Sequence, residues 1–327
     1  MNKIGILGVG SYLPEKKVTN FDLAKILDTS DEWIRARTGI KERRFASPDQ
    51  AASDLAANAA ERAIKDAGIS QEDIDLIIVG TNSPDTLYPA TACLVQDKIG
   101  AKNAAAFDLQ AGCTGWVYAS IVGAQFIKTG MYKHVLVIGV EAITKMVDEK
   151  DRDTYVLFGD GAGATILGNV DKGGLLSSVL CADGSLAEHL ILPAGGSRLP
   201  LSQEVLDKRL QYTRMNGREV FKFAVREITK VSLNAIKEAG LTVDDIRWFI
   251  PHQANLRIIE AGIKRIRIPK ERVAITIDKY GNSSAATVPI ALDEIYKADK
   301  IKTGDKLLMV SFGAGMTSGA FIVEWSK

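Results

Sequence analysis

The feature that most constrains this chain is a repeat inside it. Residues 63–68 read AIKDAG, and residues 235–240 read AIKEAG, 172 positions later. The match continues without a gap into the apolar run that follows each copy, residues 76–79 and 248–251. Self-similarity at a fixed offset indicates that one structural unit occurs twice. We therefore expect a duplicated fold.

The chain divides near the turn at residues 171–174, which gives two expected units, residues 1–172 and 173–327. Each half alternates helix-like segments with short apolar runs that are typical of buried strands. The runs are 76–79, 135–138, 249–250 and 307–310, and the expected helices are 51–67, 91–98, 113–128, 218–239, 255–266 and 283–297. Strands that are apolar on both faces belong to a parallel or mixed sheet with helices on both sides. The predicted fold class is α/β.

Composition then excludes several classes of protein. The chain has 327 residues, 41 basic against 40 acidic side chains, and 46% hydrophobic residues, which rules out disordered, collagenous and disulfide-scaffold proteins. A net charge of +1 gives no general attraction to a polyanion, so we expect no nucleic-acid or membrane partner. The N-terminal segment lacks the features of a secretory signal, which predicts a cytoplasmic protein.

One uncharged run, the 19 residues 109–127, has nearly the length of a membrane span. Its glycines and its Gln, Thr and Ser side chains make it too polar for that interpretation. We expect a helix buried inside the protein instead.

The three cysteines, Cys93, Cys113 and Cys181, are spaced neither as a disulfide framework nor as a zinc site, and the chain has only three histidines. We expect no metal centre. Cys113 stands out because it lies between two glycines at the start of the long uncharged helix. Backbone N–H groups at a helix start stabilise a thiolate, which favours a nucleophile. The alternative is a buried structural cysteine, since free cysteine is among the most buried residue types.

Two further segments carry polar groups at strand ends or helix starts. His252 follows a repeat strand, where open α/β sheets place their sites, although a hydrogen-bonded structural histidine fits equally well. Asn282 opens a helix, where it could be a plain N-cap. The repeat offset moves Cys113 to position 285, so Cys113 and Asn282 occupy the same helix start in their respective halves.

Residues 311–316 (SFGAGM) form a tight turn between two strand-like runs. Small residues there can present a backbone N–H group to a developing oxyanion, although the segment could also be only a turn. A cysteine, a histidine, an asparagine and an amide donor together form a coherent site for acyl transfer.

With these motifs in view, the chain resembles the β-ketoacyl-acyl carrier protein synthase III family of the thiolase-like superfamily, the condensing enzymes that start fatty-acid synthesis. The resemblance runs from end to end. The motifs that show this resemblance are TSDEWI (29–34), RTGI (37–40), GCTG (112–115), GDGAG (159–163), HQANLR (252–257), GNSS (281–284) and FGAG (312–315).

The resemblance implies a layered α/β/α/β/α fold, with the nucleophile in the first half and His252 and Asn282 in the second. It implies that Cys113 accepts an acyl group from acyl-CoA, and that His252 and Asn282 bind the thioester oxygen of malonyl-acyl carrier protein during decarboxylation. The backbone amides of Cys113 and Ala314 would form the oxyanion hole, although many relatives carry glycine at the position of Ala314. Coenzyme A enters only as a thioester substrate, and no resident cofactor is expected.

The resemblance also assigns binding residues. Those implied for coenzyme A are Thr29, Trp33, Arg37, Arg152, Gly217 and Asn255, and those implied for the acidic carrier protein are Lys222, Arg257 and Lys264. From the residues alone, helix packing for Trp33, a solvated loop for Arg152 and ordinary surface charge for the basic side chains fit as well. Tyr88 falls where family members often have a phenylalanine that reaches across a homodimer interface and limits the acyl pocket.

Competing functions have weaker support. A papain-like protease shares the order Cys, His, Asn but lacks its local signature and its fold. Residues 159–164 resemble a dinucleotide fingerprint, but a strand-like segment follows where a helix is needed. The alternatives that stay open are a starter condensing enzyme of a specialised polyketide, quinolone or acyl-ester pathway, and an acyltransferase that needs no carrier protein.

Overall fold

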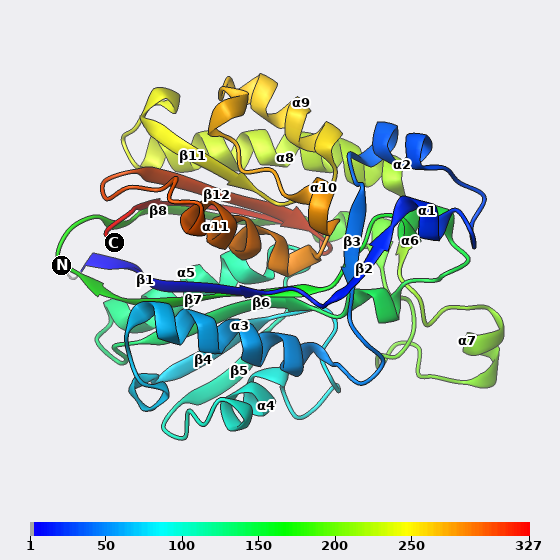
Figure 1. Ribbon diagram of the computed structural model, residues 1–327, viewed down its shortest axis with the longest axis horizontal. Helices are drawn as coiled ribbons and strands as arrows, with labels where there is room; N and C mark the ends of the chain where they lie inside the picture. The colour runs from blue at the N-terminus through cyan, green and yellow to red at the C-terminus, as the bar shows by residue number, and fades with distance from the viewer. Residues whose placement is uncertain (1–2) are drawn as a thin grey trace.

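The structure is a computed structural model that describes residues 3–327. Two mixed β-sheets form its frame (Figure 1). In sheet order, the first contains β1 (Lys3–Tyr12), β7 (Gly161–Val170), β6 (Val135–Glu141), β4 (Leu76–Gly80) and β5 (Ala105–Leu109). The second contains β8 (Gly174–Ala182), β13 (Thr317–Glu324), β12 (Lys306–Gly313) and β11 (Ile246–Pro251).

The two sheets repeat one topology. In each, the first strand of the half pairs antiparallel with the last strand, β1 with β7 and β8 with β13. The last strand pairs antiparallel with the strand before it, which in turn pairs parallel with β4 or β11. The order β1-β7-β6-β4 therefore matches β8-β13-β12-β11, and the first sheet adds β5 at its edge. The expected duplication is confirmed at the level of strand order.

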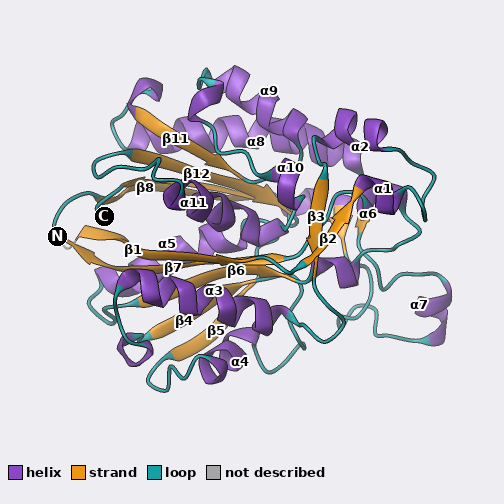
Figure 2. Cartoon of the chain, viewed as in Figure 1, coloured by secondary structure: helices purple, strands orange, loops and turns teal. Residues whose placement is uncertain are grey.

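The helices make the remaining layers. They are α3 (Ala52–Ala67) and α4 (Thr91–Lys98) on the first sheet, α8 (Gly217–Glu238) and α9 (Leu256–Ile266) on the second, and α5 (Gly115–Lys128) and α11 (Thr287–Lys297) between them. Helices α5 and α11 each contact strands of both sheets, whereas α3 and α8 each lie against one. The result is the predicted α/β/α/β/α arrangement (Figures 1 and 2).

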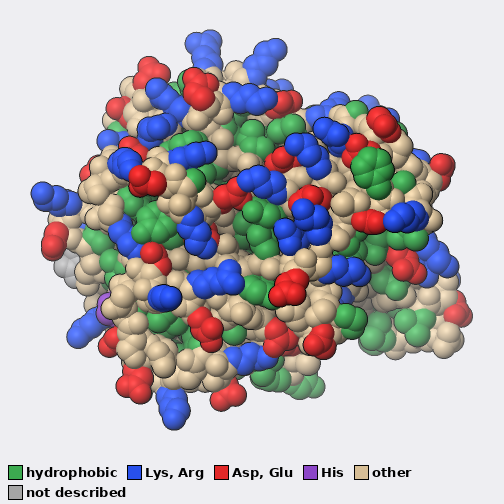
Figure 3. Space-filling model, viewed as in Figure 1, with side chains coloured by type: hydrophobic (Ala, Val, Ile, Leu, Met, Phe, Trp, Pro, Cys, Tyr) green, Lys and Arg blue, Asp and Glu red, His purple; other side chains and the backbone are tan. Residues whose placement is uncertain are grey.

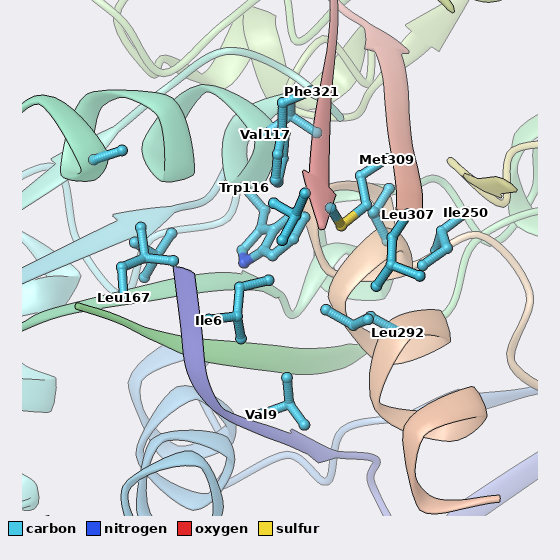
Figure 4. Close-up of a cluster of buried hydrophobic side chains, with 14 of the residues drawn as sticks. Ile6, Val9, Trp116, Val117, Leu167, Ile250, Leu292, Leu307, Met309 and Phe321 are labelled. Atoms are coloured by element: carbon cyan, nitrogen blue, oxygen red, sulfur yellow. The ribbon is translucent and has the colours of Figure 1, made fainter. Parts of the chain in front are cut away.

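The helices of the central layer pack against both sheets through apolar side chains (Figure 4). Trp116 of α5 packs on Phe321 of β13 with ring centroids 5.6 Å apart, and both side chains are buried. The uncharged run at residues 109–127 is thus an internal helix, as expected. Within residues 3–327, no helix is both long and apolar enough to cross a membrane.

Both central helices begin later than the sequence pattern predicts, and backbone geometry gives the reason. Gly112 has φ +60°, and two turn hydrogen bonds follow before α5 begins at Gly115 rather than at Cys113. Ser284 has φ +47°, a left-handed conformation that an α-helix excludes. A 3₁₀ turn (Ser284–Ala286) therefore precedes α11, which begins at Thr287 rather than at Ser283.

Smaller elements cover one end of the two sheets, at the right in Figure 1. They are β2 (Lys16–Thr19), β3 (Glu42–Phe45), α1 (Asn20–Leu23), α2 (Asp31–Thr38), α6 (Arg152–Tyr155), α7 (Gln203–Asp207) and α10 (Ile277–Tyr280), together with the short pair β9 (Leu190–Ile191) and β10 (Arg214–Met215). Long loops join them (Figure 2). On the face that Figure 3 shows, basic and acidic side chains are interspersed, in keeping with the balanced composition.

Candidate active site

A cavity of about 450 Å³ opens at this end of the molecule and draws its lining from both halves. Cys113, His252 and Asn282 all line it, as does Ala314. The structure therefore brings together the three side chains and the turn that the sequence singled out, although they are far apart in the chain.

Close packing between two loops positions Cys113. A β-carbon on Gly112 would lie 2.5 Å from the backbone nitrogen of Ala314, and one on Gly313 would lie 2.3 Å from the backbone nitrogen of Cys113. Only glycine allows either approach. The Ser311 hydroxyl then donates to the Cys113 carbonyl at 2.7 Å. The loop at residues 311–315 is thus held against the cysteine.

The sulfur of Cys113 lies in a pocket of hydrogen-bond donors, but burial dominates its chemistry. The Ser284 hydroxyl donates to the sulfur at 3.3 Å, and the backbone N–H groups of Cys113 and Ala314 also act to lower the pKa of the thiol. Burial nevertheless raises the pKa of the Cys113 thiol to about 12, with the charge of Glu141 as a further cause. Helix α5 begins at Gly115, two residues after Cys113, and burial opposes the stabilisation of a thiolate that was expected from the helix start.

His252 follows β11 and is also buried. Its backbone N–H donates to the Val310 carbonyl at 2.7 Å, and its ring contacts the Phe312 ring edge-on with centroids 5.2 Å apart. Its Nδ1 lies 2.6 Å from the Thr287 hydroxyl. Burial lowers the pKa of His252 to about 3, so the imidazole is neutral near pH 7 and carries one N–H group.

Asn282 is fixed through its backbone by the first half of the chain. Its N–H donates to the Leu157 carbonyl at 2.9 Å, and its carbonyl accepts from the Gly159 N–H at 3.1 Å. Its Oδ1 accepts from the Ser284 N–H at 2.9 Å, its Nδ2 amino group has no hydrogen-bond partner among residues 3–327, and the residue lines the cavity. The N-cap of α11 is Ala286, so Asn282 does not cap that helix; its Oδ1 instead accepts from the first residue of the 3₁₀ turn that precedes α11.

Three polar residues at the site were not assigned a role from the sequence. Ser284 donates to the Cys113 sulfur, Thr287 contacts His252, and the buried Glu141 accepts hydrogen bonds from Asn82 and Ser83. The sequence did contain a signal for Ser284. The 172-residue offset maps Cys113 onto position 285, which is the neighbour of Ser284. No motif pointed to Glu141, which lies at the end of β6.

At the cavity mouth, Trp33 lies beside two guanidinium groups. The Cζ atoms of Arg152 and Arg37 lie 4.7 and 5.1 Å from its ring centroid. Trp33, Arg37, Gly217 and Asn255 line the cavity, so four of the six residues implied for coenzyme A meet there. Arg152 contacts the ring of Trp33 but does not line the cavity. Thr29 also lies outside the lining, and its buried hydroxyl has no hydrogen-bond partner among residues 3–327.

The three basic residues implied for the carrier protein are less closely grouped. Arg257 lies at the first turn of α9 and lines the cavity. Lys264 is exposed in the last turn of the same helix. Lys222, on α8, is paired with Glu219 at 2.7 Å and borders a separate small hollow. Only Arg257 is therefore placed directly at the entrance.

Tyr88 does not line the cavity of its own chain. Its side chain is 86% exposed, next to Leu87 at 77%. A role in the acyl pocket would require a second copy of the chain and stays a prediction.

Two alternative chemistries find no support in the described residues. The glycine-rich segment at residues 159–164 leads into strand β7, not into a helix, so it cannot present a helix N-terminus to a dinucleotide phosphate. Among residues 3–327, no group of three or more His, Cys, Asp or Glu side chains could hold a metal ion.

Comparison with known proteins places the chain in a family. The family model described as 3-oxoacyl-[acyl-carrier-protein (ACP)] synthase III matches residues 107–184, and the model of its C-terminal region matches residues 236–325. The β-ketoacyl-[acyl-carrier-protein] synthase III of Caldanaerobacter subterraneus subsp. tengcongensis is 55% identical over 324 residues, 99% of this chain and 98% of the relative.

Comparison with solved structures points to the same family. The β-ketoacyl-[acyl carrier protein] synthase III of Thermus thermophilus is 48% identical, with a TM-score of 0.91 over 98% of this chain and 99% of that one. A priming β-ketosynthase from the R1128 polyketide biosynthetic pathway is 34% identical, with a TM-score of 0.92 over 99% and 97%. On this evidence the chain belongs to the β-ketoacyl-[acyl-carrier-protein] synthase III family of acyltransferases.

Proposed function

We propose that this enzyme condenses an acyl-CoA primer with malonyl-acyl carrier protein by decarboxylation, giving 3-oxoacyl-carrier protein, coenzyme A and CO₂, as the first condensation of fatty-acid synthesis. The observation that carries the proposal is one cavity in which a cysteine, two backbone donors, a neutral histidine and an asparagine amide converge. Family membership supplies the reaction class.

In the first half-reaction, Cys113 attacks the thioester carbonyl of the primer. The backbone N–H groups of Cys113 and Ala314 both act on the thiol, and we propose that an acyl oxygen bound beside it receives hydrogen bonds from both. Such donors stabilise the negative charge of the tetrahedral intermediate. Collapse of the intermediate releases coenzyme A and leaves the acyl group on Cys113. Ala314 serves as well as glycine because the donor is the backbone.

In the second half-reaction, malonyl-carrier thioester replaces coenzyme A in the cavity. Loss of CO₂ places negative charge on the thioester oxygen, which needs donors but no additional carboxylate. Asn282 offers its Nδ2 group, and His252 offers the N–H of a neutral ring. The resulting carbanion attacks the acyl-Cys113 thioester, and the product leaves on the carrier protein.

At the cavity mouth, Trp33 is proposed to stack on the adenine of coenzyme A, with Arg37, Gly217 and Asn255 along the path of its arm. The guanidinium of Arg152 already covers the Trp33 ring, so the base would enter between the two or displace Arg152. Thr29 is proposed only as a nearby contact. No resident cofactor takes part in this scheme.

The acidic carrier protein is proposed to dock on Arg257, with Lys264 and Lys222 at the edge of the same surface. We further propose a homodimer, in which exposed Leu87 and Tyr88 would be covered by the second copy. Sedimentation of a stable monomer at micromolar concentration would contradict the dimer. The divisions at residues 1–172 and 173–327 and the cytoplasmic location stay predictions.

The test is intact-protein mass spectrometry after incubation with acyl-CoAs of two to eight carbons, with Cys113→Ser as the matched control. We expect an acyl mass gain in the wild type alone, and the preferred chain would identify the primer. Adding malonyl-carrier protein to the loaded enzyme should then release 3-oxoacyl-carrier protein and CO₂. Failure of every CoA thioester to label Cys113 would refute the proposed primer.

The second candidate is a starter enzyme for a polyketide pathway, which the R1128 relative favours at 34% identity. The same mass experiment separates the two at the extender step. A fatty-acid enzyme should release its product on the carrier protein of fatty-acid synthesis, and transfer only to a different carrier would favour the polyketide role.

A further inference from the structure

Both half-reactions of the proposed scheme place negative charge on the sulfur of Cys113. The sulfur attacks the primer as a thiolate, and it departs as a thiolate when the carbanion displaces it from the acyl group. Burial raises the pKa of this thiol, so a thiolate is costly at this position. A hydrogen-bond donor that faces the sulfur would therefore assist both steps, because it favours the charged form.

One side chain donates a hydrogen bond to this sulfur. The Ser284 hydroxyl donates to it at 3.3 Å, although the two residues are 171 positions apart in the chain. Ser284 is only 1% exposed, and it lines the cavity. A hydroxyl group rotates and can accept as well as donate, so a lasting donor role requires a neighbour that fixes the direction of its proton.

The neighbour that fixes this direction is Asn82, which also lines the cavity. Its Nδ2 amino group donates to the Ser284 oxygen at 3.2 Å. An amide amino group is a donor only, so the Ser284 oxygen must accept in this contact. The proton of the Ser284 hydroxyl is then free for its other contact, the Cys113 sulfur.

A buried carboxylate, Glu141, fixes which end of the Asn82 amide faces Ser284. The Asn82 amino group donates to Oε1 of Glu141 at 2.7 Å, and the Asn82 backbone N–H lies 3.2 Å from both carboxylate oxygens. If the amide were reversed, its carbonyl oxygen would face a carboxylate oxygen, and neither atom could donate. The amino group therefore lies between Glu141 and Ser284 and donates to both.

The fold explains why these groups meet. Strands β4 and β6 pair in parallel and end at the same edge of the first sheet, so Asn82 after β4 lies beside Glu141 at the end of β6. Ser284 comes from the second half of the chain and has φ +47°. A non-glycine residue keeps a left-handed backbone where its surroundings hold it, and such residues are concentrated at active sites. The hydrogen bonds thus join the two halves and end at the nucleophile.

We propose that Ser284 is a further catalytic residue, the donor that stabilises negative charge on the Cys113 sulfur, and that Asn82 is a positioning residue that holds its hydroxyl in the donating direction. The proposal rests on the function proposed above. In acylation, the Cys113 proton passes to water, the sulfur bonds to the primer carbonyl carbon, and coenzyme A leaves as a thiolate that takes a proton back from water.

In condensation, the carbanion bonds to the acyl carbon and the bond from that carbon to sulfur breaks. The electron pair of the broken bond stays on the Cys113 sulfur, which accepts the hydrogen bond of Ser284. Ser284 keeps its own proton throughout, so its role is to stabilise charge and not to transfer a proton.

The test removes the hydroxyl in two ways. Ser284→Ala keeps the backbone N–H that donates to Oδ1 of Asn282, and Ser284→Gly keeps it while also suiting the positive φ. Asn82→Ala removes the amino group that orients the hydroxyl. The matched control is Ser283→Ala, because Ser283 is the equally buried neighbour of Ser284 but does not line the cavity.

Three rates are measured at pH 7 for each variant. They are alkylation of Cys113 by iodoacetamide, acylation of Cys113 by the acyl-CoA that labels the wild type best, and cleavage of the acyl-Cys113 thioester by hydroxylamine. The first needs no substrate, and the third reports departure of the sulfur. Cys93 is exposed on α4 and serves as an internal control for alkylation, read from its own peptide by mass spectrometry.

Hydrogen bonds to charged groups are strong enough that loss of this donor should lower the thiolate fraction of Cys113 by roughly 10- to 150-fold. A more basic thiolate is also more nucleophilic, which offsets about half of the loss on a logarithmic scale. Alkylation and acylation should therefore slow by roughly 3- to 15-fold in Ser284→Ala and Ser284→Gly. Thioester cleavage should slow as well, because the sulfur becomes a poorer leaving group.

Asn82→Ala should slow the same reactions by a smaller factor, because the hydroxyl remains but can turn away from the sulfur. Ser283→Ala should keep the wild-type rates, and Cys93 should react at the same rate in every variant. Circular dichroism checks that each variant is folded, and Ser284→Gly decides the matter if Ser284→Ala is not.

Cys113 rates in both Ser284 variants that equal or exceed those of the wild type would overturn the donor role. A loss in Ser284→Ala that Ser284→Gly restores would overturn it too, since the backbone and not the hydroxyl would then be responsible. Wild-type rates in Asn82→Ala would overturn the positioning role.

The two proposals fail in different ways. If no acyl-CoA labels the wild type but alkylation of Cys113 slows in the Ser284 variants as expected, the donor stands and the proposed primer fails. If acyl-CoA labels the wild type and the Ser284 variants at equal rates, the condensing function stands and the donor fails.

Discussion

Thr287 is the hydrogen-bond partner of His252 Nδ1, and its removal gives a quantitative test of the decarboxylation step. The hydroxyl has one proton and two neighbours, the Ser284 carbonyl at 3.0 Å and His252 Nδ1 at 2.6 Å. If it donates to the carbonyl, Nδ1 carries the ring proton and Nε2 cannot donate. If it donates to Nδ1, the proton sits on Nε2, where it can stabilise the thioester oxygen.

The change Thr287→Val keeps the shape of the side chain and leaves Nδ1 of a ring that is only 1% exposed without a partner. An unsatisfied buried group costs about 1–3 kcal/mol. At tenfold per 1.4 kcal/mol, such a cost at the decarboxylation step corresponds to a loss of roughly 5- to 150-fold. The Ser284 carbonyl keeps a donor, because the Thr287 backbone N–H also bonds to it.

The assay is release of CO₂ from malonyl-carrier protein, measured beside acylation of Cys113. We expect Thr287→Val to lose decarboxylation by that factor and to keep acylation, since Thr287 forms no hydrogen bond with Cys113. Thr287→Ser retains the hydroxyl and should retain both activities. Decarboxylation within twofold of the wild type in Thr287→Val would refute the role given to the hydroxyl.

Three further predictions follow from the same geometry. Trp33→Ala should raise the KM for acyl-CoA with little change in kcat, and an unchanged KM would place the adenine elsewhere. Charge reversal at Arg257 or Lys264 should weaken carrier-protein binding less at high salt than at low salt, and a loss that salt does not alter would indicate misfolding. Because burial lowers the pKa of His252 to about 3, the unfolded chain binds a proton below its ordinary pKa of 6.5 that the folded chain does not. The free energy of unfolding should therefore fall as pH drops from about 6.5 toward 3, by up to about 1.4 kcal/mol per pH unit, and urea titrations of His252→Gln at pH 7 and 5 should lack this contribution.

Much of the fold was predictable because the repeat is visible as short sequence patterns that recur in both halves. Apolar runs marked the central strands, and the offset of 172 residues correctly indicated that the second sheet repeats the first. Helix starts were predicted less well. Positive φ angles at Gly112 and Ser284 delay α5 and α11, and a positive φ at a serine has no signature in the sequence.

The site was predictable in part. Cys113, His252 and Asn282 were expected together, and they line one cavity. The sequence shows the helix start that favours a thiolate at Cys113 but not the burial that raises the pKa of the thiol, so its ionisation could not be predicted from the sequence. Glu141 was missed because its contacts with Asn82 and Ser83 depend on the pairing of β6 with β4.

The position of the site follows from the duplication itself. In two similar units packed face to face, equivalent residues near the shared axis come into contact. Cys113 and its repeat position 285 are such a pair: Ser284 touches the Cys113 sulfur, and a β-carbon on Gly115 would lie 3.3 Å from that of Ala285. One half supplies the nucleophile at this contact and the other supplies the hydroxyl and amide that act on it. Neither half contains a complete site, and α5 buries its apolar face against both sheets, so we expect residues 1–172 alone neither to fold stably nor to accept an acyl group.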